Sequence, residues 1–434
     1  MPHNARCRRS ISTLTRALLL LTVVMGLLQA HTYTVLYTFT GGTDGGDPYG
    51  GVIRDSAGNL YSTTYLGGLI NSTCTSGCGV VFKLDARGRV TVLHSFAGPP
   101  ADGAGPQAGL IADSAGNLYG TTTWGGAVTS ACPSGCGIVF KIDSRGRETV
   151  LYNFAGSPSD GSRPQAALVR DPAGNLYGTT YQGGHIAKTC GTGCGVVFKI
   201  EPGGTERVLY RFTGGSDGAN PEAGLMLDSA GNLFGTTSIG GRDHISSCLG
   251  YHNLPLGCGV LFKLSSAGAE TVLYGFYGTG DGRNPAGDVI RDSSGNLYTT
   301  TNMGGSGNGG VVFRLDTNGK PAVVHSFPGF SGDGGYPYAG VIRDSAGGIY
   351  GTTSGGGYTN GGACSSGCGV VYQVTAGGKE TILHTFTGGP DGGNPYAGLV
   401  KDPAGNLYGT ASFGGGTGGP CGSIGCGVVF QIQP

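Results

Sequence analysis

The sequence predicts an all-β fold, a seven-bladed β-propeller of four-stranded blades. A motif related to Asp-Ser-Ala-Gly-Asn-Leu-Tyr recurs seven times along the 434 residues. Short apolar strands separated by Gly, Asp and Asn turns fill each repeat, and a spare strand near the start of the chain matches one that is missing at the end. The Leu-Tyr core of the motif begins at Leu60, Leu118, Leu176, Leu233, Leu297, Ile349 and Leu407, at intervals of 52 to 64 residues.

The first complete repeat contains four expected strands, which we call a to d from the inside of the ring outwards. They are residues 51–54, 60–65, 80–84 and 90–96. Their β-branched and aromatic residues are typical of strands, and apolar side chains fall on both faces. Two apolar faces indicate sheets packed between neighbouring sheets, as propeller blades are.

The two ends of the chain are expected to close the ring. Residues Tyr33 to Phe39 match the d strands, although no a, b or c strand precedes them. The chain finishes with Gly427 to Ile432, which matches a c strand that lacks its d strand. Pairing of the two segments would hide strand edges that an open array exposes. An open β-solenoid is the alternative fold, but it has no use for this complementary offset.

The composition argues against two classes of partner. Lys and Arg together number 26, as do Asp and Glu, and charged residues make up only 12% of the chain. A neutral, charge-poor protein lacks the basic patch that binds nucleic acid or anionic lipid. The 91 glycines recur at fixed offsets beside the apolar runs, so they indicate turns rather than disorder.

Residues 1–30 are predicted to be a signal peptide. Four arginines precede an apolar run of 12 residues at 17–28, and Ala30 offers a small residue for cleavage. The run is short for a membrane span, although an uncleaved anchor is the alternative. We expect residues 31–434 to form the propeller, as a secreted or periplasmic monomer without a membrane span.

Twelve of the 13 cysteines form neighbouring pairs in the b–c loops. The fifth repeat has the loop Gly304 to Gly310 with no cysteine, and this joint presence or absence indicates bonding within each loop. Export leads to an oxidising environment, so disulfides are expected. Zinc is the rival interpretation, but one isolated pair per blade supplies too few ligands, and we predict no metal and no cofactor. The expected bonds join Cys74 with Cys78, Cys132 with Cys136, Cys190 with Cys194, Cys248 with Cys258, Cys364 with Cys368, and Cys421 with Cys426.

Every connection between strands d and a contains Asp-Gly-x-x-Pro. We interpret it as a turn in which Asp accepts hydrogen bonds from the amides that follow it, Gly adopts positive φ, and Pro directs the chain into the next strand. A ring of calcium-binding carboxylates is the alternative, but one carboxylate per blade is a poor calcium cage.

These motifs resemble the GloVer-type, choice-of-anchor tandem repeat family of exported bacterial proteins. The match rests on Leu-Tyr-x-Phe, Asp-Gly-x-x-Pro, Asp-Ser-Ala-Gly-Asn-Leu-Tyr-Gly-Thr-Thr and Gly-Val-Val-Phe-Lys, over residues 33–432. The resemblance implies a propeller in the cell envelope or outside the cell, and it implies no activity or catalytic residue. Family members often end in a surface anchor, and Gln433-Pro434 does not resemble one, so we expect a released or periplasmic protein.

Functional residues are expected to depart from the repeat, on the face shared by the d–a and b–c connections. The fourth b–c loop, residues 241–259, departs most in length and composition. Aromatic residues at the start of four b–c loops would stack on sugar rings or a protein partner, or would simply pack against the Gly-Gly turn; they are Tyr65, Trp124, Tyr181 and Phe413. The candidate binding residues are Trp124, Tyr181, Arg242, Asp243, His244 and Tyr251.

Glu222 and Asp288 are the carboxylates expected on innermost strands near the channel mouth. They would act as an acid and base pair in glycoside hydrolysis, or they are solvated rim charges. The histidines in the d strands, His94, His325 and His384, are interpreted as packing or edge residues. The predicted function is a binding or scaffold propeller that recognises a glycan or protein partner. The alternative is an extracellular hydrolase or lyase acting on polysaccharide.

Overall fold

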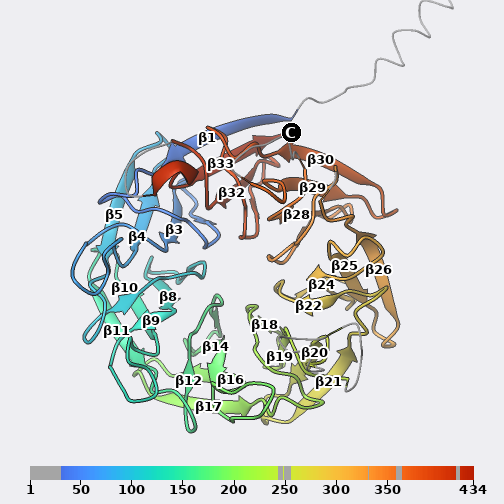
Figure 1. The fold of residues 1–434 in the computed structure, drawn as a ribbon, viewed down its shortest axis with the longest axis horizontal. Helices are drawn as coiled ribbons and strands as arrows, with labels where there is room; N and C mark the ends of the chain where they lie inside the picture. Colours follow the sequence, from blue (N-terminus) through green and yellow to red (C-terminus); the bar gives the residue numbers. More distant parts are fainter. Residues whose placement is uncertain (1–30, 243–247, 249–255, 331, 358–363, 417–420) are drawn as a thin grey trace, which may run out of the picture.

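The computed structural model describes residues 31–242, 248, 256–330, 332–357, 364–416 and 421–434. Seven β-sheets are arranged in a ring around a central axis (Figure 1). The described residues contain one short 3₁₀ turn, Gly422–Ile424, and no helix that is long and apolar enough to cross a membrane. The predicted seven-bladed propeller is therefore confirmed. The proposed signal peptide, residues 1–30, lies outside the described residues.

Each blade is an antiparallel sheet whose strands run outwards from the axis in the order a, b, c, d. From blade 1 to blade 7 the strands are β2 (Ile53–Arg54), β3 (Leu60–Thr64), β4 (Val80–Leu84) and β5 (Val90–Ser95); β7 (Ile111–Ala112), β8 (Leu118–Thr122), β10 (Ile138–Ile142) and β11 (Glu148–Asn153); β13 (Val169–Arg170), β14 (Leu176–Thr180), β16 (Val196–Ile200) and β17 (Glu206–Arg211); β18 (Met226–Leu227), β19 (Leu233–Thr237), β20 (Val260–Leu264) and β21 (Glu270–Gly275); β23 (Ile290–Arg291), β24 (Leu297–Met303), β25 (Val311–Leu315) and β26 (Pro321–Ser326); β27 (Ile342–Arg343), β28 (Ile349–Thr353), β29 (Val370–Val374) and β30 (Glu380–Thr385); and β31 (Val400–Lys401), β32 (Leu407–Ala411), β33 (Val428–Gln433) and β1 (Thr32–Thr38).

Four further short strands extend this pattern on the face of the b–c loops. Strand β6 (Gly103–Ala104) pairs with β9 (Trp124–Gly125), and β12 (Gly161–Ser162) pairs with β15 (Gln182–Gly183). Blade 5 has an additional strand, β22 (Arg283–Pro285), that pairs with β24.

The ring is closed by the two ends of the chain, as predicted. Strand β1 pairs antiparallel with β33, with Tyr33 opposite Ile432 and Val35 opposite Phe430. Figure 1 shows the blue first strand lying along the red last strand. Blade 7 therefore takes its three inner strands from the end of the sequence and its outer strand from the beginning.

Aromatic rings fill the seams between neighbouring blades. The Phe that directly follows each d strand is buried against the aromatic residue in the c strand of the next blade, with ring centroids 4.9 to 5.3 Å apart at all seven seams. Burying side chains of this size supplies a large share of the hydrophobic free energy. The seams explain why apolar residues occupy both faces of the strands.

Threonines of the Gly-Thr-Thr motif connect the blades near the axis. In six blades the threonine three residues after the start of strand b donates its hydroxyl hydrogen to a main-chain carbonyl on the innermost segment of the next blade. Thr63, for example, donates to the Ala108 carbonyl at 3.0 Å. The innermost ladders contain only two residues each, so strand a of blade 1 is shorter than the predicted 51–54. The carbonyl of Gly51 accepts from the hydroxyl of Ser62 at 3.0 Å and is therefore satisfied outside the ladder.

All six predicted disulfides are present within their b–c loops. They join Cys74 with Cys78, Cys132 with Cys136, Cys190 with Cys194, Cys248 with Cys258, Cys364 with Cys368, and Cys421 with Cys426. Since each of these twelve cysteines bonds the partner that the spacing indicated, the predicted pairing is confirmed.

The disulfides pack closely against the turns that follow the d strands. At Gly98, for example, a Cβ atom would lie 2.9 Å from the Cys78 sulfur and 3.1 Å from the Cys74 sulfur, and φ is +80°. Only glycine fits such a position, so the disulfides and turns together form a tightly packed face.

The Asp-Gly-x-x-Pro segments are turns, but their hydrogen bonds differ from the prediction. Asp217 accepts from the amide of Thr213, at 2.7 Å, and from the hydroxyl of Tyr210, at 3.0 Å. Both donors precede the aspartate in sequence, because the carboxylate turns back to cap the end of the d strand. At Asp102 the following amide, that of Gly103, also donates.

Candidate binding site

The residue that follows the proline in each Asp-Gly-x-x-Pro segment lies at the centre of the ring. Together these seven residues line a central cavity of about 260 Å³ with contributions from every blade. Their identities differ, unlike those of the surrounding repeat, so this ring is the part of the inner surface that distinguishes the blades. The residues are Tyr49, Gln107, Gln165, Glu222, Ala286, Tyr338 and Tyr396.

The structure places both predicted carboxylates, Glu222 and Asp288, in this central cavity. Asp288 stands at a position where the other blades have Gly or Ala, and its Oδ1 accepts a hydrogen bond from the Gly224 amide at 2.6 Å. The inner strands surround both carboxylates and limit solvation of the charged forms, although Asp288 still faces solvent in the channel. They raise the pKa of Glu222 to about 7, and they also raise the pKa of Asp288.

Five aromatic residues lead from the cavity across the face of the ring, and we call them the aromatic track. The rings of Tyr338 and Tyr396 are 5.3 Å apart, those of Tyr396 and Tyr49 are 5.2 Å apart, and those of Tyr49 and Tyr65 are 5.7 Å apart. Trp124 continues the track beyond Tyr65, with Gly105 between them. A Cβ on that glycine would lie 2.7 Å from Tyr65 and 3.3 Å from Trp124.

Trp124 separates two grooves at the outer end of the track. One groove, of about 330 Å³, is lined by Tyr65, Trp124 and Pro99, among others. The other, of about 580 Å³, is lined by Trp124, Arg163 and Gln182, among others. The guanidinium of Arg163 lies 4.0 Å from the centre of the indole ring, which is a cation–π contact. Burial lowers the pKa of Arg163.

The other predicted binding residues have different surroundings. Tyr181 is half-buried, and its pKa is raised by burial and by the negative charge of Glu222. Arg242 packs 4.1 Å from the centre of the Tyr277 ring, and its Nε donates to the Gly275 carbonyl. The remaining three, Asp243, His244 and Tyr251, lie outside the described residues.

Comparison with known proteins identifies the repeat. The Gloeobacter/Verrucomicrobia repeat matches residues 22–249 and 250–365, which is most of the chain. The chain belongs to this family. Among curated proteins, none matches the sequence.

Solved structures of propeller proteins resemble this Gloeobacter/Verrucomicrobia repeat protein at low sequence identity. A gluconolactonase from Xanthomonas campestris is 14% identical, with 95% of this chain and 92% of that chain covered and a TM-score of 0.42. A putative 6-phosphogluconolactonase from Bacteroides uniformis is 15% identical, with 78% and 84% covered and a TM-score of 0.46. The tricorn protease is 11% identical, with 84% and 27% covered and a TM-score of 0.41.

Sequence reasoning did not single out four members of this site. Tyr49, Tyr338, Tyr396 and Arg163 belong to Asp-Gly-x-x-Pro segments or follow their proline directly. The signal that would have found the tyrosines is variation at a repeat position that lies between a proline present in all seven repeats and a Gly or Ala.

A second set of polar side chains lies at the outer seams between neighbouring blades of this Gloeobacter/Verrucomicrobia repeat protein. The residue two positions before the Phe that directly follows each d strand is Tyr or His. In six blades a hydrogen bond joins it to the aspartate of the following turn; the Tyr152 hydroxyl, for example, donates to Asp160 at 3.0 Å. At four seams the next d strand begins with Glu, as at Glu206. The d-strand histidines therefore form ion pairs in addition to the predicted packing.

Stability is expected to depend on pH at one such seam. Burial and the nearby charge of Asp160 raise the pKa of Glu206 to about 7, with Arg211 opposing the shift. The folded state therefore holds a proton that the unfolded chain, with a pKa of about 4.3, releases, so stability falls as pH rises from about 4 to 7. Replacing Glu206→Gln should stabilise the protein by about 1 kcal/mol at pH 8, after allowance for solvent screening, and hardly at all at pH 4.

Thermal unfolding at the two pH values checks this expectation. The matched control is Glu201→Gln, which removes an exposed glutamate from the same blade. An equal gain for Glu206→Gln at both pH values would show that its charge does not oppose folding.

Proposed function

We propose that the protein is an exported glycan-binding propeller whose ligand lies along the aromatic track, from the grooves beside Trp124 to the central cavity. The observation that carries the proposal is the series of aromatic rings that joins three hollows, with ring contacts from Tyr338 to Tyr65 and with Gly105 between Tyr65 and Trp124. Sugar rings present apolar faces that stack on aromatic side chains, and their hydroxyls need polar partners. Gln107, Gln165 and Gln182 offer such partners.

The proposed location outside the cytoplasm is supported by two features. Six disulfides join cysteines within the described residues, and such bonds persist in oxidising compartments. The first 30 residues have the composition of a signal peptide. We expect the exported protein to bind as a monomer, because one ring carries the entire track.

Replacing Trp124→Ala is expected to weaken glycan binding at least about tenfold, since a central tryptophan commonly contributes more than about 1.4 kcal/mol. A glycan array first identifies an oligosaccharide, and titration calorimetry then compares the variants. Trp124→Phe should retain part of the affinity because it keeps an aromatic face. Tyr177→Phe is the matched control, because its hydroxyl bonds to Asp171 in an a–b turn at the opposite end of the blade.

Three outcomes would contradict this proposal. They are the absence of any bound glycan on the array, a Trp124→Ala variant that binds as tightly as the unmodified protein, and a Tyr177→Phe variant that loses as much affinity as Trp124→Ala. Specific binding to a protein without attached sugar would instead support recognition of a protein partner.

A polysaccharide hydrolase or lyase is the second candidate function. It is favoured by the presence of Glu222 and Asp288 in one cavity and by the pKa of Glu222, which lies near the range of a general acid at neutral pH. The same glycans should be tested for turnover. Glu222→Gln and Asp288→Asn should remove turnover and preserve binding if these carboxylates are catalytic. Absence of turnover by the unmodified protein on a broad panel would count against this candidate.

A further inference from the structure

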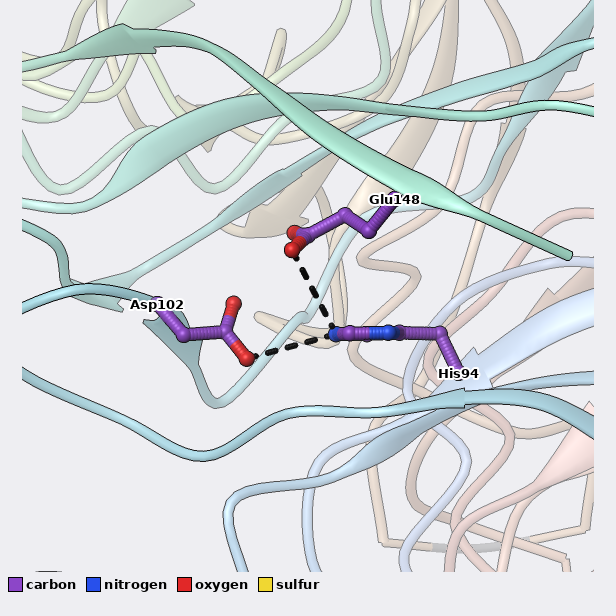
Figure 2. A group of neighbouring side chains, drawn as sticks. All are labelled: His94, Asp102 and Glu148. Carbon is purple, nitrogen blue, oxygen red and sulfur yellow. Dashed lines mark hydrogen bonds and ion pairs between the residues drawn. The ribbon is translucent and has the colours of Figure 1, made fainter.

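Three side chains from two blades converge at the outer seam between blades 1 and 2. His94 comes from β5, Asp102 from the turn that follows it, and Glu148 from the start of β11. The Nε2 atom of His94 is 3.3 Å from Asp102 Oδ2 and 3.6 Å from Glu148 Oε2. Figure 2 shows both carboxylates directed at this one nitrogen. The other oxygen of Glu148 is buried and has no hydrogen-bond partner.

The same three residue types meet at the seam between blades 5 and 6. His325, Asp333 and Glu380 occupy the equivalent repeat positions, and in each group the ligand atoms lie within 4.8 Å of one another. His325 Nε2 is 3.3 Å from Glu380 Oε2 without hydrogen-bond geometry, and the Glu380 side chain is only 9% exposed. Glu380 Oε1 is also buried without a hydrogen bond. The convergence of all three residue types thus occurs twice in the described residues. The buried glutamate oxygen without a hydrogen bond is shared with Glu206 and Glu270, so the histidine is what distinguishes these two seams.

A proton alone satisfies these groups poorly. Nε2 of an imidazole carries at most one hydrogen, so it can donate to one of the two carboxylates that face it. Asp102 already accepts hydrogen bonds from the amides of Ala97 and Gly103, so the carboxylate left short of a donor is that of Glu148, partly buried beside the negative charge of Asp102. A divalent cation between the three side chains would accept electron pairs from all of them.

The spacing matches a tetrahedral zinc site. Zinc binds imidazole nitrogen and carboxylate oxygen at about 2.0–2.2 Å, so the ligand atoms of a tetrahedron lie about 3.3–3.5 Å apart. The distances of 3.3 and 3.6 Å at His94 are close to this value. One nitrogen and two oxygens favour zinc over calcium, which takes about six to eight oxygens. Asp333 is exposed, which gives an ion a route to the second group.

We propose that the protein binds two zinc ions, one at His94, Asp102 and Glu148 and the other at His325, Asp333 and Glu380. Each ion joins the outer strands of two neighbouring blades, with water as the fourth ligand. The sites are structural clips at the outer wall, separate from the aromatic track.

The repeat itself supplies matched controls. His384 occupies the same position in blade 6 and pairs with Asp391 at 3.2 Å, but Tyr33 takes the place of the glutamate and stacks on the histidine at 3.7 Å. Conversely, the seam between blades 2 and 3 has both carboxylates, Asp160 and Glu206, with Tyr152 in place of histidine. The seam between blades 6 and 7, which lacks the glutamate, should not bind zinc. The seam between blades 2 and 3 should gain a site when a histidine replaces Tyr152.

Zinc stoichiometry tests the proposal. The full chain with its disulfides formed is treated with EDTA, dialysed and titrated with zinc chloride, and bound metal is measured by mass spectrometry. Two equivalents are expected, because the bonded cysteines offer no thiolate. His94→Ala and His325→Ala should each lose one equivalent, and the double variant should lose both. His384→Ala should retain both, and Tyr152→His should bind a third.

Two further measurements guard against effects of misfolding. Glu148→Gln keeps the shape of the side chain and should also lose one equivalent, and circular dichroism verifies the fold of each variant. Cobalt in place of zinc should give the visible absorption of a tetrahedral ion, which disappears in the double histidine variant. Retention of both equivalents by the double variant, loss of one in His384→Ala, no third equivalent in Tyr152→His, or fewer than two equivalents in the unmodified protein would overturn the proposal.

Discussion

Deleting residues 32–39 is expected to prevent the chain from folding as a monomer. The deletion removes β1, which pairs with β33 through six residue pairs, and it removes Phe39, which is 2% exposed and packs on Phe82 of blade 1. Truncating a buried phenylalanine alone typically costs about 3–5 kcal/mol. The exposed edge of β33 would also promote association with other chains. Circular dichroism and light scattering would report loss of the fold or formation of aggregates.

Moving the strand instead of deleting it provides the control. A circular permutant places residues 32–39 after Ile432, connected by a copy of residues 85–88 from the turn that links β4 to β5 in blade 1, so that five residues separate Ile432 from its partner Tyr33, as five separate Leu84 from Val90. This variant has the same strands and the same closure, so it should fold as a monomer. Normal folding of the deletion variant, or failure of both variants, would show that pairing of β1 with β33 is not what the ring requires.

Reducing all six disulfides is expected to destabilise the protein by roughly 12 kcal/mol. Five of them join cysteines four or five residues apart and the sixth spans ten residues, and closing a loop of about five residues contributes about 2 kcal/mol by the chain-entropy relation. The sum is comparable to the whole stability of a typical domain. Guanidinium unfolding of oxidised and reduced protein measures the difference.

Blade 5 gives this experiment an internal control. Its loop from Gly304 to Gly310 has no cysteine, and Gly309 donates to the Phe327 carbonyl at 3.1 Å instead. Below the unfolding transition, reduction should accelerate hydrogen exchange in the six cysteine-containing loops and leave residues 304–310 unchanged. Equal acceleration in all seven loops would mean that the disulfides act on the ring as a whole.

The prediction from sequence was strongest where the contacts lie within one repeat. Strand limits such as Val80–Leu84 agree with the structure, and each cysteine bonds the neighbour that the spacing indicated. Turn chemistry was predicted less well. Asp217 accepts hydrogen bonds from residues before it, because the end of the d strand leaves an amide that needs an acceptor.

The candidate site was predicted only in part. Trp124 and Glu222 differ clearly from the residues at the same positions in the other repeats. Trp124 lines a groove on the loop face, and Glu222 lines the central cavity. The grouping of Tyr49 with Tyr396 could not be read from the chain, because these rings are 5.2 Å apart in space but belong to blades 1 and 7. The same holds for His94 and Glu148, which a repeat length separates.

The amino-acid sequence by itself determined the number of blades, the closure of the ring and the pairing of the cysteines, since these follow from a regular spacing of local elements. The tertiary structure alone decided which side chains of different blades meet, at the aromatic track, in the central cavity and at the outer seams. The physical reason is that such meetings depend on the angle and distance between whole sheets. Aromatic packing at the seams sets that geometry, and no periodicity along the chain expresses it.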